Sequence, residues 1–135
     1  MKRVCFVRHG ESLSNTTQSK NGSEHESAPL SEKGKEEASA FALEYQGNPS
    51  LIVTSKYDRT KETASYLINK FPGVDIEEWE DLREFNYIKS YSSLKEKKQI
   101  KQAYWEKLDP NYKEDFSVES FSEFLERAKN VLQKI

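Results

Sequence analysis

The segment Val4–Asn15, with the sequence VCFVRHGESLSN, places an arginine and a histidine side by side directly after four apolar residues. The guanidinium of Arg8 stays charged at any physiological pH and can hold two oxygens of a phosphate at once. The ring of His9 offers a neutral nitrogen that can attack phosphorus and form a phosphohistidine. Gly10 follows without a Cβ atom, so backbone and ligand can approach each other closely. The segment therefore predicts chemistry on an anionic group.

Two later segments contain the other groups that this chemistry needs. Phosphoryl transfer requires positive groups that neutralise the charge on the phosphoryl oxygens, a nucleophile in line, and a proton for the leaving oxygen. Arg59 stands at a predicted helix start, where the helix dipole disfavours a cation unless an anion is its partner. Glu84, in EDLREFNY, can protonate the departing oxygen if its pKa is raised in the bound complex. Because two arginines supply the positive charge, we expect a site without a metal or a cofactor.

Three short segments are expected to form the strands that position these residues. Residues 2–7 (KRVCFV) and 51–55 (LIVTS) are continuous apolar runs, which are typical of buried strands in a parallel sheet. Residues 74–79 (VDIEEW) give a weaker third strand. Cys5, inside the first of these runs, is expected to be a packing residue.

Four segments with helical periodicity are expected between and after the strands. They are residues 31–45 with Ser31 as cap, 59–71 with Asp58 as cap, 89–108, and 117–135. The last is expected to turn one apolar stripe inward, formed by Phe121, Phe124, Leu125, Ala128, Leu132 and Ile135. The stretch between the first site segment and the first helix is polar and contains His25, which we interpret as a loop residue.

The alternation of strands and helices predicts an α/β fold, a single domain over residues 1–135 with a mainly parallel sheet layered between helices. In such folds ligands bind at the carboxyl ends of the strands. Arg8 and His9 follow the first expected strand, Arg59 the second, and Glu84 the third. We therefore expect these four side chains at one rim of the sheet.

Composition restricts the class of partner. The chain has 135 residues, with 21 basic and 23 acidic side chains and a net charge of −2, so no overall charge favours nucleic acid or an anionic membrane. The apolar run before Arg8 is too short for a signal peptide or a membrane span. A single cysteine suits a reducing compartment, and we expect a cytoplasmic protein.

The order of these motifs resembles that of the histidine phosphatase superfamily, which includes phosphoglycerate mutases. FVRHGES with Asn15 is similar to its R-H-G-E-[ST]-x-x-N signature, and PLSEKGKEEA to its P-L-T-x-x-G-x-x-Q-A helix start. TSKYDRTKETA resembles S-S-x-x-x-R-[AT]-x-[QE]-T-A, DLREFNY resembles the L-x-E segment, and residues 117–135 resemble the helix that follows.

The resemblance implies a role for each matching residue. His9 would be the nucleophile, Arg8 and Arg59 the phosphate clamp, and Glu84 the acid. Ser12 and Asn15 would make lesser contacts with the phosphate. The implied fold is phosphoglycerate mutase-like.

The chain departs from the family pattern at its end. Family members continue into a further core strand that ends in a second histidine, whereas the only other histidine here is His25. His25 does not follow an apolar run, so we do not assign it that role. The chain is thus expected to be incomplete at the C-terminus, and without that strand we expect self-association through the first strand or the last helix.

Three functions are compatible with these observations. The first is a phosphatase that hydrolyses small phosphomonoesters through a phosphohistidine, impaired to the extent that the second histidine is required. The second is a phosphate-binding or regulatory module with weak catalysis, which would bind a phosphate or sulfate ion through Arg8 and Arg59. The third and least favoured is a mutase.

Overall fold

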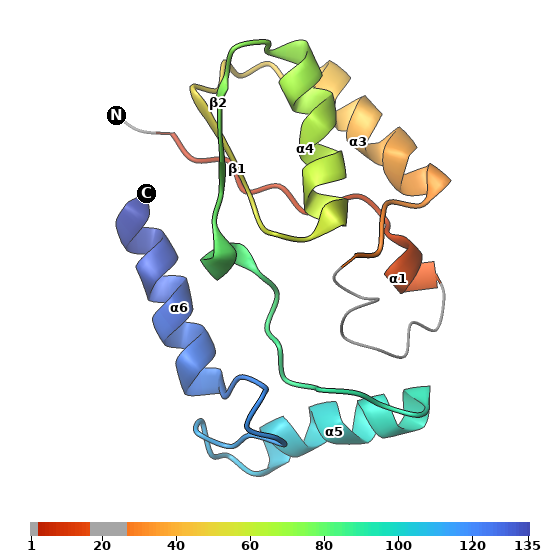
Figure 1. Ribbon diagram of the computed structural model, residues 1–135, viewed down its shortest axis with the longest axis vertical. Helices are drawn as coiled ribbons and strands as arrows, with labels where there is room; N and C mark the ends of the chain where they lie inside the picture. Colours follow the sequence, from red (N-terminus) through yellow and green to blue (C-terminus); the bar gives the residue numbers. More distant parts are fainter. Residues whose placement is uncertain (1–2, 17–26) are drawn as a thin grey trace. The chain divides into compact units, whose positions relative to one another are not determined.

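The computed structural model describes residues 3–16 and 27–135, and these fall into two compact units. The first unit comprises the described residues up to Arg83, and the second begins at Glu84 and runs to Ile135 (Figure 1). Each unit is considered by itself, and the single domain expected over residues 1–135 stays a prediction. His25 lies outside the described residues.

The first unit contains a parallel pair of strands joined by a helix. Strand β1 (Leu51–Thr54) pairs with β2 (Asp75–Glu78), with Leu51 opposite Asp75 and Thr54 opposite Glu78. Helix α4 (Asp58–Lys70) connects them. The parallel pairing confirms the strands predicted from LIVTS and VDIEEW and the α/β class of the fold.

A second helix of this unit, α3 (Glu32–Glu44), packs on α4, which in turn packs on β1 (Figure 1). The helices bury small side chains, Ala38 and Ala42 from α3 and Ala64 from α4, so their backbones can approach closely. Ser31 caps α3 as predicted, because its hydroxyl accepts a hydrogen bond from the amide of Gly34 at 3.1 Å.

The start of α4 differs from the prediction by one residue. Tyr57 is the N-cap, and Asp58 is the first residue of the helix instead of its cap. An acidic side chain in the first turn still interacts favourably with the helix dipole. The short helices α1 (Leu13–Thr16) and η1 (Glu80–Leu82) complete the elements of the first unit.

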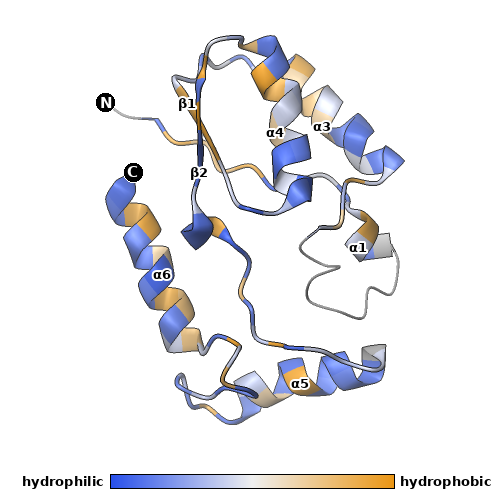
Figure 2. Cartoon of the chain, in the orientation of Figure 1, coloured by the Kyte–Doolittle hydropathy of each residue, from blue (hydrophilic) through white to orange (hydrophobic). Residues whose placement is uncertain are grey.

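The strand expected at residues 2–7 is not formed in the part that the structure describes. Residues 3–7 are exposed, including Phe6 at 72%, and Figure 2 shows the hydrophobic character of this segment. Strands β1 and β2 pair with each other, and no described backbone hydrogen bond joins residues 3–8 to either of them. Cys5 is likewise exposed and not a packing residue.

The second unit contains two capped helices, α5 (Leu94–Glu106) and α6 (Phe121–Lys134). Both lie within the predicted ranges 89–108 and 117–135 and begin after a serine cap, Ser93 in α5 and Ser120 in α6. In α6 the cap is reciprocal, since the Ser120 hydroxyl accepts from the Glu123 amide and the Glu123 carboxylate accepts from the Ser120 amide.

The buried face of α6 is not the predicted one. Leu125 is 41% exposed and Leu132 is 65% exposed, whereas Arg127 and Val131 are buried. Of the predicted stripe, Phe121, Phe124, Ala128 and Ile135 are half-buried, and Leu125 and Leu132 are exposed. Self-association through this face or through residues 3–7 stays a prediction.

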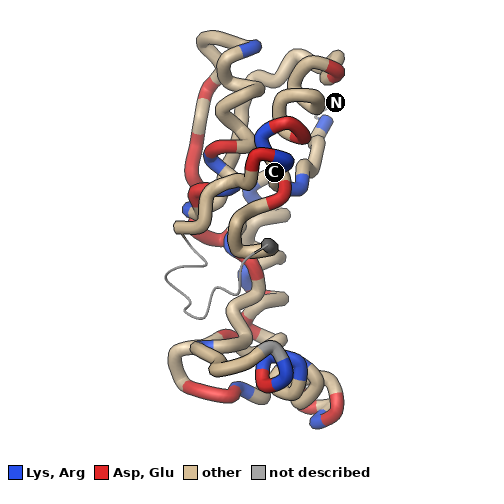
Figure 3. Tube along the Cα trace, turned by 90° about the vertical axis from the view of Figure 1, so that its right-hand side faces the viewer, with Lys and Arg blue, Asp and Glu red and all other residues tan. Residues whose placement is uncertain are grey.

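Acidic and basic residues are interspersed along the described parts of the trace in Figure 3, in keeping with the net charge of −2. Among the described helices, none combines the length and the apolar character that crossing a membrane requires.

Two glycines let the segment after residue 8 lie directly against α3. A Cβ atom on Gly10 would lie 2.4 Å from the carbonyl oxygen of Gly34, and one on Gly34 would lie 1.9 Å from the carbonyl oxygen of Glu11. The contact is also hydrogen-bonded, because the amide of Ser31 donates to the Glu11 carbonyl at 2.9 Å and the amide of Glu11 donates to Glu37 at 2.9 Å. The main chain around His9 is therefore fixed on α3.

This packing predicts that Gly34→Ala destabilises the protein. Alanine normally stabilises a helix relative to glycine, but here the added methyl group would collide with the Glu11 backbone, at an expected cost of about 1–3 kcal/mol. Urea unfolding measures the change, with Glu36→Ala on the exposed side of the same helix as control. Equal or greater stability of Gly34→Ala would show that the contact is not close.

Candidate active site

The ring of His9 has a defined partner at each nitrogen. Its Nδ1 lies 2.7 Å from the carbonyl oxygen of Gly10, and its Nε2 lies 3.2 Å from Nε of Arg59. A carbonyl oxygen only accepts, so Nδ1 carries the proton and donates it. The Arg59 N–H only donates, so Nε2 must accept with its lone pair. Both contacts select the same tautomer, in which Nε2 is the basic and nucleophilic nitrogen.

Arg59 provides a buried positive charge beside this nitrogen. It lies in the first turn of α4 and is 1% exposed. Its guanidinium carbon is 4.3 Å from the centre of the Tyr57 ring, a cation–π contact that orients the group. The charge of Arg59 adds to the partial positive charge of the α4 N-terminus, so an anion at Nε2 of His9 would be stabilised by both.

Thr63 connects these two elements and was not singled out by the sequence analysis. Its hydroxyl accepts a hydrogen bond from the amide of Gly10 at 3.2 Å and donates one to the carbonyl of Arg59 at 2.8 Å. Thr63 is buried and stands one helical turn after Arg59. That spacing was the available signal, because residues one turn apart share a helix face.

Ser12 and Asn15 bind each other at the start of α1. The amide and the hydroxyl of Ser12 both donate to Oδ1 of Asn15, at 3.0 Å and 2.8 Å. Ser12 is fully buried, whereas the side chain of Asn15 is exposed. These bonds shape the loop after His9, and a direct phosphate contact of either residue stays a prediction.

Arg8 precedes His9 and is exposed. Within the described ranges, its side chain forms no hydrogen bond or ion pair. The structure thus brings Arg59 to His9 and leaves Arg8 on the surface next to it. A surface guanidinium beside His9 can bind an anion without first giving up a partner among the described residues.

Glu84 is the first residue of the second unit, and its side chain is exposed. Burial, and to a smaller extent the negative charge of Glu84, raise the pKa of the Tyr87 phenol. The juxtaposition of Glu84 with His9 stays a prediction, as it joins residues of different units. No cluster of three or more metal-ligating side chains occurs among residues 3–16 and 27–135.

Comparison with known proteins identifies relatives of this fold. The sequence matches the family described as histidine phosphatase superfamily (branch 1) over residues 4–135. No curated protein matches the chain.

Three solved structures illustrate the similarity. Bacillus stearothermophilus YhfR has a TM-score of 0.73 at 24% identity, over 94% of this chain and 63% of its own. The alpha-ribazole phosphatase of Shigella flexneri has a TM-score of 0.73 at 19% identity, over 95% of this chain and 64% of its own. A mycobacterial glucosyl-3-phosphoglycerate phosphatase in complex with VO3 has a TM-score of 0.67 at 23% identity, over 93% of this chain and 60% of its own. The chain thus spans less than two thirds of the length of each.

The bridging role of Thr63 gives a stability prediction. Thr63→Val keeps the shape but leaves the buried amide of Gly10 without its acceptor, which should lower the free energy of unfolding by about 1–3 kcal/mol. Thr63→Ser keeps the hydroxyl and deletes one methyl group, at a smaller expected cost of about 0.8 kcal/mol. Urea unfolding compares the two variants. A valine variant as stable as the serine variant would contradict the bridge.

Proposed function

The chain belongs to the histidine phosphatase superfamily, and from that premise we propose that it hydrolyses small phosphomonoesters through a phosphohistidine at His9. One observation carries the proposal. The contacts of Gly10 and Arg59 select the ring tautomer in which Nε2 is unprotonated and carries the electron pair that would attack phosphorus. The ordinary structural role of a histidine would require neither this tautomer nor a buried arginine at that nitrogen.

In the first step, Nε2 of His9 attacks the phosphorus atom and forms an N–P bond. The P–O bond to the leaving group breaks, and the leaving oxygen takes a proton from Glu84 in the proposed role of general acid. Arg59 donates a hydrogen bond to Nε2 before substrate binds. As the phosphorus approaches, that N–H leaves the electron pair of Nε2 and donates to the phosphoryl oxygens instead. Arg8 adds a second positive charge from the surface.

In the second step, water cleaves the phosphohistidine. The Glu84 carboxylate accepts a proton from the water, the N–P bond breaks, and inorganic phosphate leaves. The electron pair of that bond returns to Nε2, and Gly10 continues to hold the proton on Nδ1. The ring is then restored in the tautomer from which it started.

The named relatives support an anionic substrate. One is described as an alpha-ribazole phosphatase and another as a glucosyl-3-phosphoglycerate phosphatase, and the structure of the second is a complex with VO3. Vanadium oxyanions resemble the phosphoryl group in shape and charge. From these descriptions we propose for this chain only the general substrate class, a small phosphomonoester.

One observation favours the alternative, a phosphate-binding or regulatory module. The anion site of Arg59 and His9 lies within the first unit, whereas the proposed acid lies in the second. Anion binding therefore requires the first unit alone, but turnover requires both units to act together. Binding without turnover is the outcome that would distinguish the module from the enzyme.

The nucleophile can be tested by trapping the phosphoenzyme. With an aryl phosphate as substrate, the chain should form an acid-labile phosphoprotein and release phosphate, and His9→Ala should abolish both because no other group supplies the attacking nitrogen. His25→Ala, which replaces the only other histidine, is the matched control and should retain both signals. Unchanged labelling in His9→Ala would contradict the mechanism.

The same experiment separates the two functions. If the chain shows no labelling and no release, but phosphate raises its thermal midpoint and Arg59→Ala removes that shift, the binding module is supported instead.

A further inference from the structure

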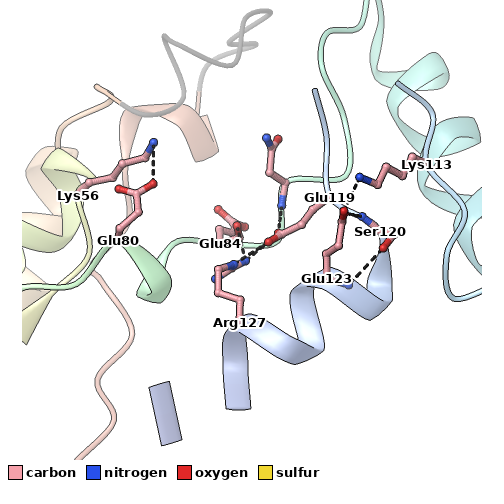
Figure 4. A network of polar contacts seen from close by, with 9 residues as sticks. Lys56, Glu80, Glu84, Lys113, Glu119, Ser120, Glu123 and Arg127 are labelled. Atoms are coloured by element: carbon pink, nitrogen blue, oxygen red, sulfur yellow. Dashed lines mark hydrogen bonds and ion pairs between the residues drawn. The ribbon is translucent and has the colours of Figure 1, made fainter. Parts of the chain in front are cut away.

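The side chain of Glu84 is exposed, but the backbone segment that carries it is hydrogen-bonded to buried side chains of the second unit. Figure 4 shows the ion pair responsible, between Arg127 of α6 and Glu119 just before it. Nε of Arg127 donates to one carboxylate oxygen of Glu119 at 2.6 Å, and Nη2 donates to the other at 2.8 Å. Both side chains are only 8% exposed.

The pair is bonded to the main chain on either side of Phe85. The amide of Glu119 donates to the carbonyl of Asn86 at 2.7 Å, and the amide of Asn86 donates to the Glu119 carboxylate at 3.3 Å. Nη2 of Arg127 also lies 3.5 Å from the carbonyl oxygen of Glu84 (Figure 4). The backbone of the segment 84–86 is therefore hydrogen-bonded at both ends to one buried ion pair.

Phe85 adds an apolar anchor to the same segment. Its ring centre lies 5.1 Å from that of Phe124 and 6.3 Å from that of Phe121, both on α6, and 5.8 Å from that of Tyr104 on α5. With residue 85 packed inward and its neighbours hydrogen-bonded, the Cα atom of Glu84 has little freedom to move within the second unit.

Stability alone does not account for this arrangement. A buried ion pair is costly to desolvate and can often be replaced by apolar side chains of similar volume without loss of stability. Apolar side chains, however, could neither accept the hydrogen bond of the Asn86 amide nor donate one to the Glu84 carbonyl. The specific effect of the pair is thus the position of the segment.

We propose that Glu119 and Arg127 are positioning residues, which hold the segment 84–86 so that the Glu84 carboxylate is presented to the leaving oxygen of the substrate. The inference rests on the proposed function, because it assumes that Glu84 is the general acid. Neither side chain touches the substrate in this account. Both act through the main chain of residues 84 and 86.

The test compares substrates that differ in their need for an acid. An alkyl phosphate has a poor leaving group that must be protonated, whereas 4-nitrophenyl phosphate has a good one that leaves with little help. Replacement of the pair by Glu119→Leu together with Arg127→Met removes both contacts with the segment and avoids an unpaired buried charge. We expect kcat/KM for the alkyl ester to fall at least about tenfold more than for the aryl ester.

Two further variants serve as references. Glu84→Gln measures the full effect of losing the acid. It should lower kcat/KM for the alkyl ester more than for the aryl ester, and by a larger factor than the double variant does. Lys113→Met removes the exposed ion pair with Glu123 of α6 and should leave the ratio of the two kcat/KM values unchanged. A general loss of folded protein lowers kcat/KM for both substrates by the same factor, so it would not change this ratio.

The outcomes distinguish the two proposals. If Glu84→Gln does not change the ratio, or if the unmodified chain hydrolyses neither ester, the proposed function fails and this inference with it. If Glu84→Gln changes the ratio but the double variant does not, the function stands and the positioning role is overturned.

Amide hydrogen exchange gives a readout that does not depend on turnover. The amide of Asn86 should exchange at least about tenfold faster in the double variant because its acceptor is lost, while the amide of Val131 in α6 keeps its protection. Unchanged exchange at Asn86 would overturn the positioning role.

Discussion

The backbone of Gly10 is the point on which the geometry at His9 depends. Its carbonyl fixes the proton on Nδ1, its amide is bound by Thr63, and the absence of a Cβ atom lets it lie against Gly34. Through Thr63 the same residue is tied to the carbonyl of Arg59. One glycine thus sets the tautomer of His9 and the position of its main chain relative to α3 and α4.

The two units contribute in different ways. In the first, close backbone packing between helices and the loop at His9 builds a small, positively charged site around one buried arginine. In the second, a buried ion pair and an aromatic cluster support an exposed carboxylate at Glu84. In the proposed function, the first arrangement binds an oxyanion and the second holds the residue that delivers a proton.

Sequence patterns predicted those features that depend on local chemistry. The apolar run LIVTS identified β1, the weaker pattern VDIEEW identified β2, and the Ser31 cap located α3. The helix dipole disfavours a cation at a helix start, and this pointed to Arg59. The patterns failed for residues 3–7, which are apolar but exposed and unpaired with the described strands, and for α6, where Arg127 and not Leu132 is buried. Thr63 was missed because its role depends on a contact with residue 10, far away in sequence.

The protonation of the His9 ring is the central claim, since both the attack and the role of Arg59 follow from it. Nitrogen-15 NMR of the imidazole, at a pH where the ring is neutral, assigns the proton directly to one of its two nitrogens. The account predicts a protonated Nδ1 and an unprotonated Nε2 at His9. A proton on Nε2 would contradict it, because that nitrogen could then neither accept from Arg59 nor attack phosphorus.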